Sequence, residues 1–184
     1  VYKRQHYHNV EHVTNCLDLV DQYRSQIPNA DLVELAFWFH DAVYDAQSKT
    51  NELDSANWAT QFLEAQGATE NTRQSVYELI MATQHTASDL STDAQWMVDI
   101  DLSILGAEPT AFDQYEKNIR LEYAWVPDEL FHQRRADLLE GFLARPRLFN
   151  TAALQEQFEA KARENLQRSI VPKRDASASF LRST

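Results

Sequence analysis

Residues 35–45 read LAFWFHDAVYD, where an apolar run meets a His-Asp pair. The run predicts a helix that starts near Asp31 and faces a core as far as Phe39. An isolated charge in an apolar setting is very costly, so a buried Asp41 beside a buried His40 must be paired or bound to a metal. The stretch therefore predicts either a His–Asp hydrogen bond within the core or a metal site at a helix end.

Helical spacing of apolar residues continues on both sides of this stretch, with turn residues between the segments. The chain has only 3 glycines, few for a protein built of strands and tight turns. We therefore expect an all-α fold of about eight helices in one domain, residues 6–171. The residues expected at or near the helix starts are Asn9, Asp31, Thr50, Thr69, Ser91, Pro109, Pro127 and Thr151.

We expect both ends of the chain to lie outside this domain. Residues 1–5, VYKRQ, match the translated end of a common sequencing adapter, so we interpret them as a sequencing scar. The last helix is expected to end near Ser169, and residues 172–184 to form a loose tail.

Composition narrows the function classes. The chain has 184 residues, 43% of them hydrophobic, which suits one core. No apolar run approaches the roughly 18–20 residues that span a membrane. The one cysteine and the lack of a visible secretory signal favour the cytoplasm. A net charge of -11 disfavours duplex nucleic acid, although a bound cation would let an acidic protein handle phosphates.

Two histidines precede this stretch at helical spacing. His8 and His12 lie one turn apart near a helix start, so both can face one side. Both could bind one metal, or one could bind the metal while the other meets substrate. The alternative is a capping or surface pair.

Two later segments add acidic and imidazole groups. Asp99 and Asp101 diverge by about 200° on a helix, so one is expected to face the site and the other to pair, cap or face solvent. His85 ends the fourth helix, where an exposed His would interact favourably with the helix dipole. Such a mixture of imidazole and carboxylate ligands suits a divalent transition metal, Mg²⁺ or Mn²⁺.

The order His, His-Asp, Asp on an all-α scaffold resembles the HD superfamily of metal-dependent phosphohydrolases. YHNVEH at 7–12 and DIDLS at 99–103 are similar to the Y-H-N-x-x-H and A-D-L-S segments of the cyclic-nucleotide phosphodiesterases in that superfamily. From His6 to about Leu166 the chain also resembles a bacterial family of predicted HD phosphohydrolases. Gln5 departs from that family, which tends to have Arg there. The segments that carry this likeness are WFHDAVYD, ATQH, DIDLSILG, EYAWVP and FLARPRLFN.

The resemblance implies a single-domain HD-type helical bundle that cleaves a phosphoester with a metal-activated water. It implies a nucleotide or another small phosphomonoester or diester as substrate. The cofactor would be a divalent ion, among Mn, Mg, Fe, Co, Ni and Zn. The implied metal ligands are His12, His40, Asp41 and Asp101.

The same resemblance gives His8 the role of proton donor to the leaving oxygen, with support of the site from outside the ligand shell as the rival. His85 would touch phosphate or help hold a second metal. Asp45 would orient the attacking water or a ligand imidazole, unless it is an exposed Asp at a helix end.

Further residues are candidates for substrate binding. Asn51 and Glu52 follow Thr50, and helix capping explains them nearly as well. On the later helices, Arg120 is the candidate that would bind the substrate anion, together with Arg134 and Arg135. The alternative is that these arginines lie on a solvated helix face.

Two other function classes stay open. A non-catalytic nucleotide-binding HD module would use the same fold without turnover. A di-iron HD oxygenase needs extra His ligands between the HD pair and the last Asp, where only His85 lies. The sequence does not specify an oligomeric state.

Overall fold

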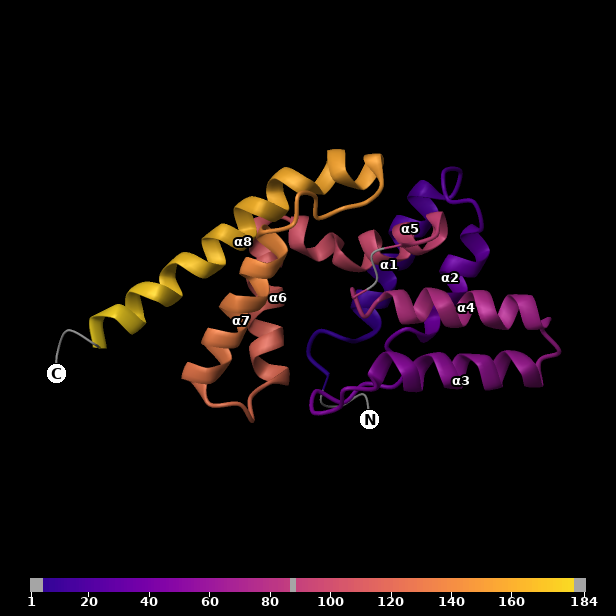
Figure 1. Cartoon of the computed structure of the whole chain (residues 1–184), viewed down its shortest axis with the longest axis horizontal. Coiled ribbons are helices and arrows are strands. Elements are labelled where there is room, and N and C mark those ends of the chain that lie inside the picture. The colour runs from indigo at the N-terminus through magenta and orange to yellow at the C-terminus, as the bar shows by residue number, and fades with distance from the viewer. Residues whose placement is uncertain (1–4, 87–88, 181–184) are drawn as a thin grey trace. The chain divides into compact units, whose positions relative to one another are not determined.

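The computed structural model describes residues 5–86 and 89–180 (Figure 1). These residues form eight α-helices joined by turns, with no β-strand among them, which confirms the all-α prediction. The chain divides after Asp101 into two compact units, and each is described by itself below. The single-domain organisation stays a prediction.

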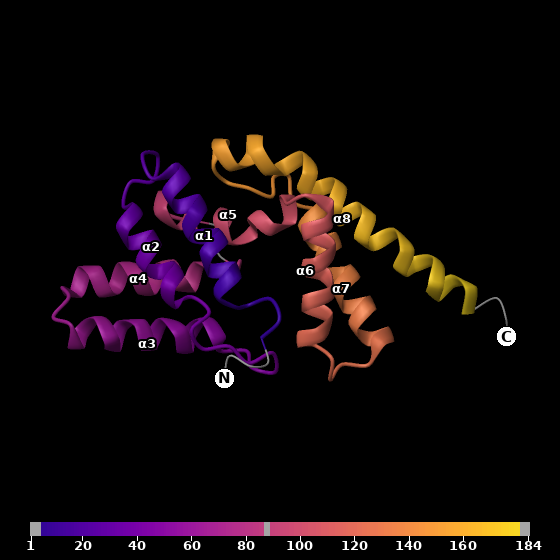
Figure 2. The same cartoon turned by 180° about the vertical axis from the view of Figure 1, so that it is seen from behind.

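The first unit contains five helices. They are α1 (Val10–Tyr23), α2 (Ala30–Phe39), α3 (Asn51–Ala65), α4 (Glu70–Ala82) and α5 (Thr92–Asp101). Helix α2 contacts each of the other four, and α3 and α4 lie side by side, as both views show (Figures 1 and 2). The end of α2 is therefore held from several directions.

The expected caps fix several helix starts in this unit. The Asn9 side chain accepts hydrogen bonds from the backbone N–H groups of Glu11 and His12, which satisfies two donors that the helix leaves open. Thr69 accepts from the N–H of Thr72 in the same way at α4. These local bonds confirm the predicted starts of α1 and α4, and the first of them places His12 in the first turn of α1.

The core of the first unit is centred on α2. Val33, Ala36 and Phe37 have no exposed surface, and His40 just beyond them is only 2% exposed. Burying a Val or Phe side chain contributes about 1.5–3 kcal/mol. The apolar face of α2 thus carries His40 and Asp41 to the end of a well-packed helix.

The second unit contains three long helices and a short 3-10 helix, η2 (Leu102–Gly106). The long helices are α6 (Pro109–Glu122), α7 (Asp128–Leu143) and α8 (Ala152–Phe180). A Cβ on Gly106 would lie 2.6 Å from the Cβ of Phe158, so glycine is required for α8 to pack against η2.

The two chain ends differ in how they meet the predictions. Residues 1–4 of the predicted scar and residues 181–184 of the predicted tail lie outside the described residues. Between them and Ser169, helix α8 continues through Pro172 to Phe180, so the expectation of a loose tail from residue 172 is wrong as far as Phe180. Lys, Arg and Ala after Pro172 are good helix formers, which is consistent with the continuation.

Among the described residues, no helix combines the length and the apolar character that a bilayer span needs.

Candidate metal centre

Four side chains of the first unit lie close together around His12, which forms one group of donor atoms with His40 and Asp41 and contacts Asp101. His12 is in the first turn of α1, His40 caps the C-terminus of α2 and Asp41 follows it. Asp101 is the last residue of α5. Its neighbour Asp99 is fully buried, so the two aspartates diverge as the helical geometry predicts and Asp101 is the one at the cluster.

The donor atoms lie close to one another. The Nε2 atoms of His12 and His40 are 3.1 Å apart. Oδ2 of Asp41 is 3.0 Å from Nε2 of His40 and 3.6 Å from Nε2 of His12. Oδ1 of Asp101 is 3.2 Å from Nε2 of His12 and 3.7 Å from Nε2 of His40. Both rings and both carboxylates therefore direct an atom to a shared space.

The backbone sets the orientation of the His40 ring. Its Nδ1 lies 2.9 Å from the carbonyl oxygen of Phe37. A carbonyl can only accept, so Nδ1 carries a hydrogen and donates it. In the neutral ring the lone pair is then on Nε2, which faces His12, Asp41 and Asp101. Metal-binding histidines commonly donate the hydrogen of one ring nitrogen to a backbone carbonyl, which turns the other nitrogen toward the metal.

The Asp41 carboxylate provides an independent test of whether a cation fits. Its Oδ2 is buried and accepts no hydrogen bond within the described part of the chain, although His40 Nε2 is only 3.0 Å away. Two ligands about 2.1 Å from one ion and at right angles to each other are about 3.0 Å apart, and about 3.4 Å in a tetrahedron. The observed spacings bracket these values, so the nitrogen and oxygen donors fit a divalent ion.

Charges in the cluster shift its protonation. Burial disfavours the charged form of His40, but the carboxylates of Asp41 and Asp101 outweigh burial and raise the pKa of His40 to about 9. Burial would raise the pKa of Asp41, yet the positive charge of His40 lowers it to about 2. The pKa of Asp101 is well below its usual range because contacts with His12 and His85 overcome its burial. Positive charge, from a proton or a cation, thus holds the carboxylates together.

His85 lies at the edge of the cluster. Its Nε2 is 3.1 Å from Oδ2 of Asp101, the oxygen turned away from His12. The residue follows α4 and has a φ of 57°, in the left-handed region that non-glycine residues seldom occupy. The predicted site residue is therefore next to a predicted ligand.

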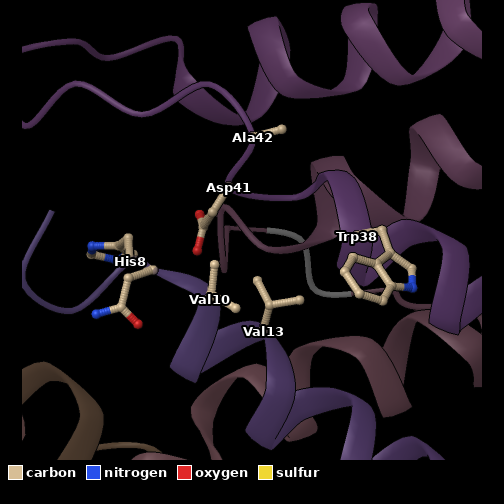
Figure 3. Close-up of a pocket in the computed structure, with 7 residues that line it drawn as sticks. His8, Val10, Val13, Trp38, Asp41 and Ala42 are labelled. Atoms are coloured by element: carbon tan, nitrogen blue, oxygen red, sulfur yellow. The ribbon is translucent and has the colours of Figure 1, made fainter. Parts of the chain in front are cut away.

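His8 is beside the cluster rather than within it. Its ring stacks on Tyr44 with the centroids 4.0 Å apart, and it is 6.3 Å from the ring of His12. His8 and Asp41 line the same pocket (Figure 3). The position suits a group that acts on a substrate near the cluster.

Asp45 has a different place from the one predicted. Helix α2 ends at Phe39, so Asp45 is not one helical turn beyond Asp41. It is exposed, and its Oδ1 accepts a hydrogen bond from the N–H of Gln47. Its Oδ1 closes a loop, and a role of Asp45 toward a water or a ligand imidazole stays a prediction.

The two candidates at the start of α3 serve the same loop or the helix start. Asn51 accepts from the backbone N–H of Asp45 and donates to its carbonyl oxygen. Glu52 is half-buried in the first turn of α3, where an acidic side chain interacts favourably with the helix dipole. The hydrogen bonds of Asn51 close the loop at Asp45 and do not cap α3, and a substrate role for Asn51 stays a prediction.

The arginine candidates belong to the second unit, and two of them, Arg120 and Arg135, form hydrogen bonds and ion pairs there. Arg120 donates to the carbonyl oxygens of Tyr123 and Val126 and pairs with Asp128, which ties the end of α6 to the start of α7. Four of its five N–H donors are used in these bonds, which favours the structural role, and the substrate role of Arg120 stays a prediction. Arg134 is exposed and Arg135 is buried.

Sequence reasoning missed Cys16 as a neighbour of the cluster. Its Sγ is 3.8 Å from Nδ1 of His12, and the thiol is only 1% exposed. Donor atoms of His12, Cys16 and Asp101 lie within 4.8 Å of one another. The signal was the spacing of four from His12 on one helix face. Cys16 adds a soft sulfur donor beside the nitrogen and oxygen ligands.

No protein-family model, no curated protein and no solved structure matches this chain. Membership of the HD superfamily therefore stays a prediction from the quoted residues. The convergence of the four side chains is the ground on which function is proposed.

Proposed function

We propose that the protein is a metal-dependent phosphohydrolase of the HD type that cleaves a small phosphoester. The observation that carries the proposal is the convergence of His12, His40, Asp41 and Asp101, drawn from three helices, on one space. These four residues would hold the ion. When bound, a divalent ion lowers the pKa of a water and offsets the negative charge of a phosphoryl group.

The chain's own residues supply orientation and a proton. The Phe37 carbonyl holds the His40 ring with its Nε2 turned to the cluster. His85 contacts the Asp101 carboxylate from the other side and keeps that side chain in place. His8, stacked on Tyr44, donates a proton to the oxygen that leaves phosphorus as water adds.

Ser55 on α3 fixes the segment that carries Asp41. Its hydroxyl bonds to both the N–H and the carbonyl oxygen of Val43, 3.1 and 3.2 Å away, and the side chain has no exposed surface. A carboxylate two residues from such an anchor keeps its position without help from a helix. The anchor explains how Asp41 stays at the site after α2 has ended.

Metal analysis followed by a substrate panel tests the proposal. Purified protein is loaded in turn with Mn²⁺, Co²⁺, Ni²⁺, Mg²⁺, Fe²⁺ and Zn²⁺, its metal content is measured, and phosphomonoesters, phosphodiesters and nucleotides are assayed. We expect one ion or more per chain and metal-dependent release of phosphate or alcohol. His40→Ala should abolish both, while His132→Ala, an exposed histidine of the second unit, should change neither.

The same experiment separates the other two classes. A loaded protein that cleaves no ester but binds a nucleotide tightly would be a binding module. Oxygen consumption by the iron-loaded protein, with no phosphate released, would indicate an oxygenase. Absence of any bound ion at millimolar metal would overturn the proposal.

A further inference from the structure

A pocket opens beside the candidate metal centre, within the first unit. It is lined by His8, Asn9, Val10, Val13, Trp38, Asp41 and Ala42 (Figure 3). His8 and Asp41 lie on one side of Val13 in this view and Trp38 lies on the other. The pocket thus begins beside His8 and Asp41 and extends away from them along α1 and α2 toward Trp38.

The two ends of the pocket differ in chemistry. At one end are a proposed metal ligand, Asp41, and the proposed proton donor, His8. The other lining residues are apolar except Asn9, whose side chain already caps α1 and donates to the carbonyl oxygen of His6, and none of the residues that line this pocket is Lys or Arg. An anionic group would find no cationic partner along these walls. An apolar group is the part of a substrate that they can bind.

Two of the apolar side chains are unusually open to solvent. Val10 is 69% exposed and Trp38 is 58% exposed. Removing such surface from water is favourable in proportion to its area, and an indole face prefers another ring at offset-stacked or edge-on geometry. The pocket volume is about 110 Å³, which is of the order of the apolar cavity of about 150 Å³ that holds benzene. A single ring matches this volume.

We propose that this pocket holds the leaving group of the phosphoester, and that the substrate is an aryl phosphomonoester with a single ring. The inference rests on the proposed function and specifies its substrate class. In the step, the oxygen of water bonds to phosphorus and the bond from phosphorus to the aryl oxygen breaks. The proton of His8 passes to the aryl oxygen, the water gives up one of its protons to solvent as it bonds to phosphorus, and His8 takes a proton back from solvent, so the products are inorganic phosphate and a phenol.

Kinetics with a matched pair of esters tests the inference. Phenyl phosphate and 2-hydroxyethyl phosphate share the phosphoryl group and differ in the part that meets the pocket. Trp38→Ala should raise KM for phenyl phosphate about tenfold, the scale of one lost aromatic contact with its buried area, and leave KM for the hydroxyethyl ester unchanged. Trp38→Phe keeps an aromatic face and should restore most of the loss.

Trp58→Ala is the matched control. Trp58 is 46% exposed, contacts Phe39 and does not line the pocket, so its removal should leave both KM values unchanged. Equal changes in KM for both esters in Trp38→Ala, or a preference of the wild type for the hydroxyethyl ester, would overturn the aryl assignment while leaving hydrolysis established.

Binding of phenol gives a readout that needs no turnover. Saturation-transfer NMR with phenol and the metal-loaded protein should show contact with the wild type and with Trp58→Ala, and much weaker contact with Trp38→Ala. Contact that depends on Trp38 in a protein that cleaves no phosphoester would support the aryl pocket and overturn the hydrolytic function. Contact that is independent of Trp38 would overturn the pocket.

Discussion

The Nε2 atoms of His12 and His40 lie 3.1 Å apart, although the residues are 28 positions apart and belong to α1 and α2. Two imidazole lone pairs cannot face each other at this distance without positive charge between them. His40 already uses Nδ1 to donate to Phe37. A neutral His12 that carries its hydrogen on Nε2 can donate it to His40, and the alternative is a cation bound by both nitrogens. The next two predictions follow from the second arrangement.

Removing the charge of Asp41 should empty the centre. Asp41→Asn keeps the size of the side chain but removes its negative charge and replaces one carboxylate oxygen with an NH₂ group. In the wild type the Oδ2 oxygen accepts no hydrogen bond within the described residues. Loss of an outer partner of a metal ligand weakens binding roughly 10–100-fold, and loss of a ligand should exceed that. Calorimetric titration with Mn²⁺ or Co²⁺ measures the change. Asp18→Asn, on the exposed side of α1, is the control, and equal affinity in both variants would exclude Asp41 as a ligand.

Metal affinity should rise with pH from 6 to 8. The pKa of His40 is raised to about 9, so in the metal-free protein the ring is protonated at neutral pH. An ion must displace that proton, and the apparent affinity should increase about tenfold for each pH unit below 9. Asp41, with its pKa lowered to about 2, stays ionised throughout and adds no slope. Calorimetry in buffers of different ionisation enthalpy counts the proton released, and a flat affinity profile would contradict this assignment.

His8→Ala should separate catalysis from metal binding. His8 stacks on Tyr44 outside the cluster, so metal content should be unchanged. Turnover of phenyl phosphate should fall roughly 100-fold or more if His8 is the general acid. The loss should be smaller for 4-nitrophenyl phosphate, whose leaving group needs less protonation. Loss of metal from this variant to the same degree as from His40→Ala would instead make His8 a ligand.

Ser55→Ala should destabilise the first unit and weaken metal binding. The change leaves the N–H and carbonyl of Val43 without their buried partner. An unsatisfied buried polar group costs about 1–3 kcal/mol. Chemical denaturation should report a loss on this scale, whereas Ser48→Ala, in the half-buried loop before α3, should cost less. Stability equal to the wild type would show that the segment after α2 is held by other contacts.

Much of the first unit follows from local patterns in the sequence. Asn9 and Thr69 cap helices as predicted because an N-cap bond involves only residues two or three positions away. The 100° step of a helix likewise separates Asp99 from Asp101, so that only one faces the cluster. The buried run before His40 predicted a helix end at the core, where the structure places it.

The remaining features depend on contacts that no local pattern encodes. Asp45 lies in a loop and not at a helix end, because α2 stops at Phe39 and the chain turns. Arg135 is buried because Glu116, 19 positions earlier, accepts its guanidinium hydrogens. From the sequence, Cys16 indicates only that no internal disulfide can form. Its closeness to the cluster depends on how α1 packs against its neighbours, which no local pattern shows.

The backbone at His85 carries one more consequence. A left-handed φ of 57° costs a non-glycine residue about 1 kcal/mol, and the contact between its ring and Asp101 works against that cost. His85 thus holds one oxygen of the aspartate from a backbone position that is unfavourable for a residue with a side chain. An anion or a second ion that competes for the His85 ring or for this Asp101 oxygen would let the backbone of His85 relax. Breaking the contact between His85 and Asp101 should therefore cost less free energy than breaking the other contacts of the centre.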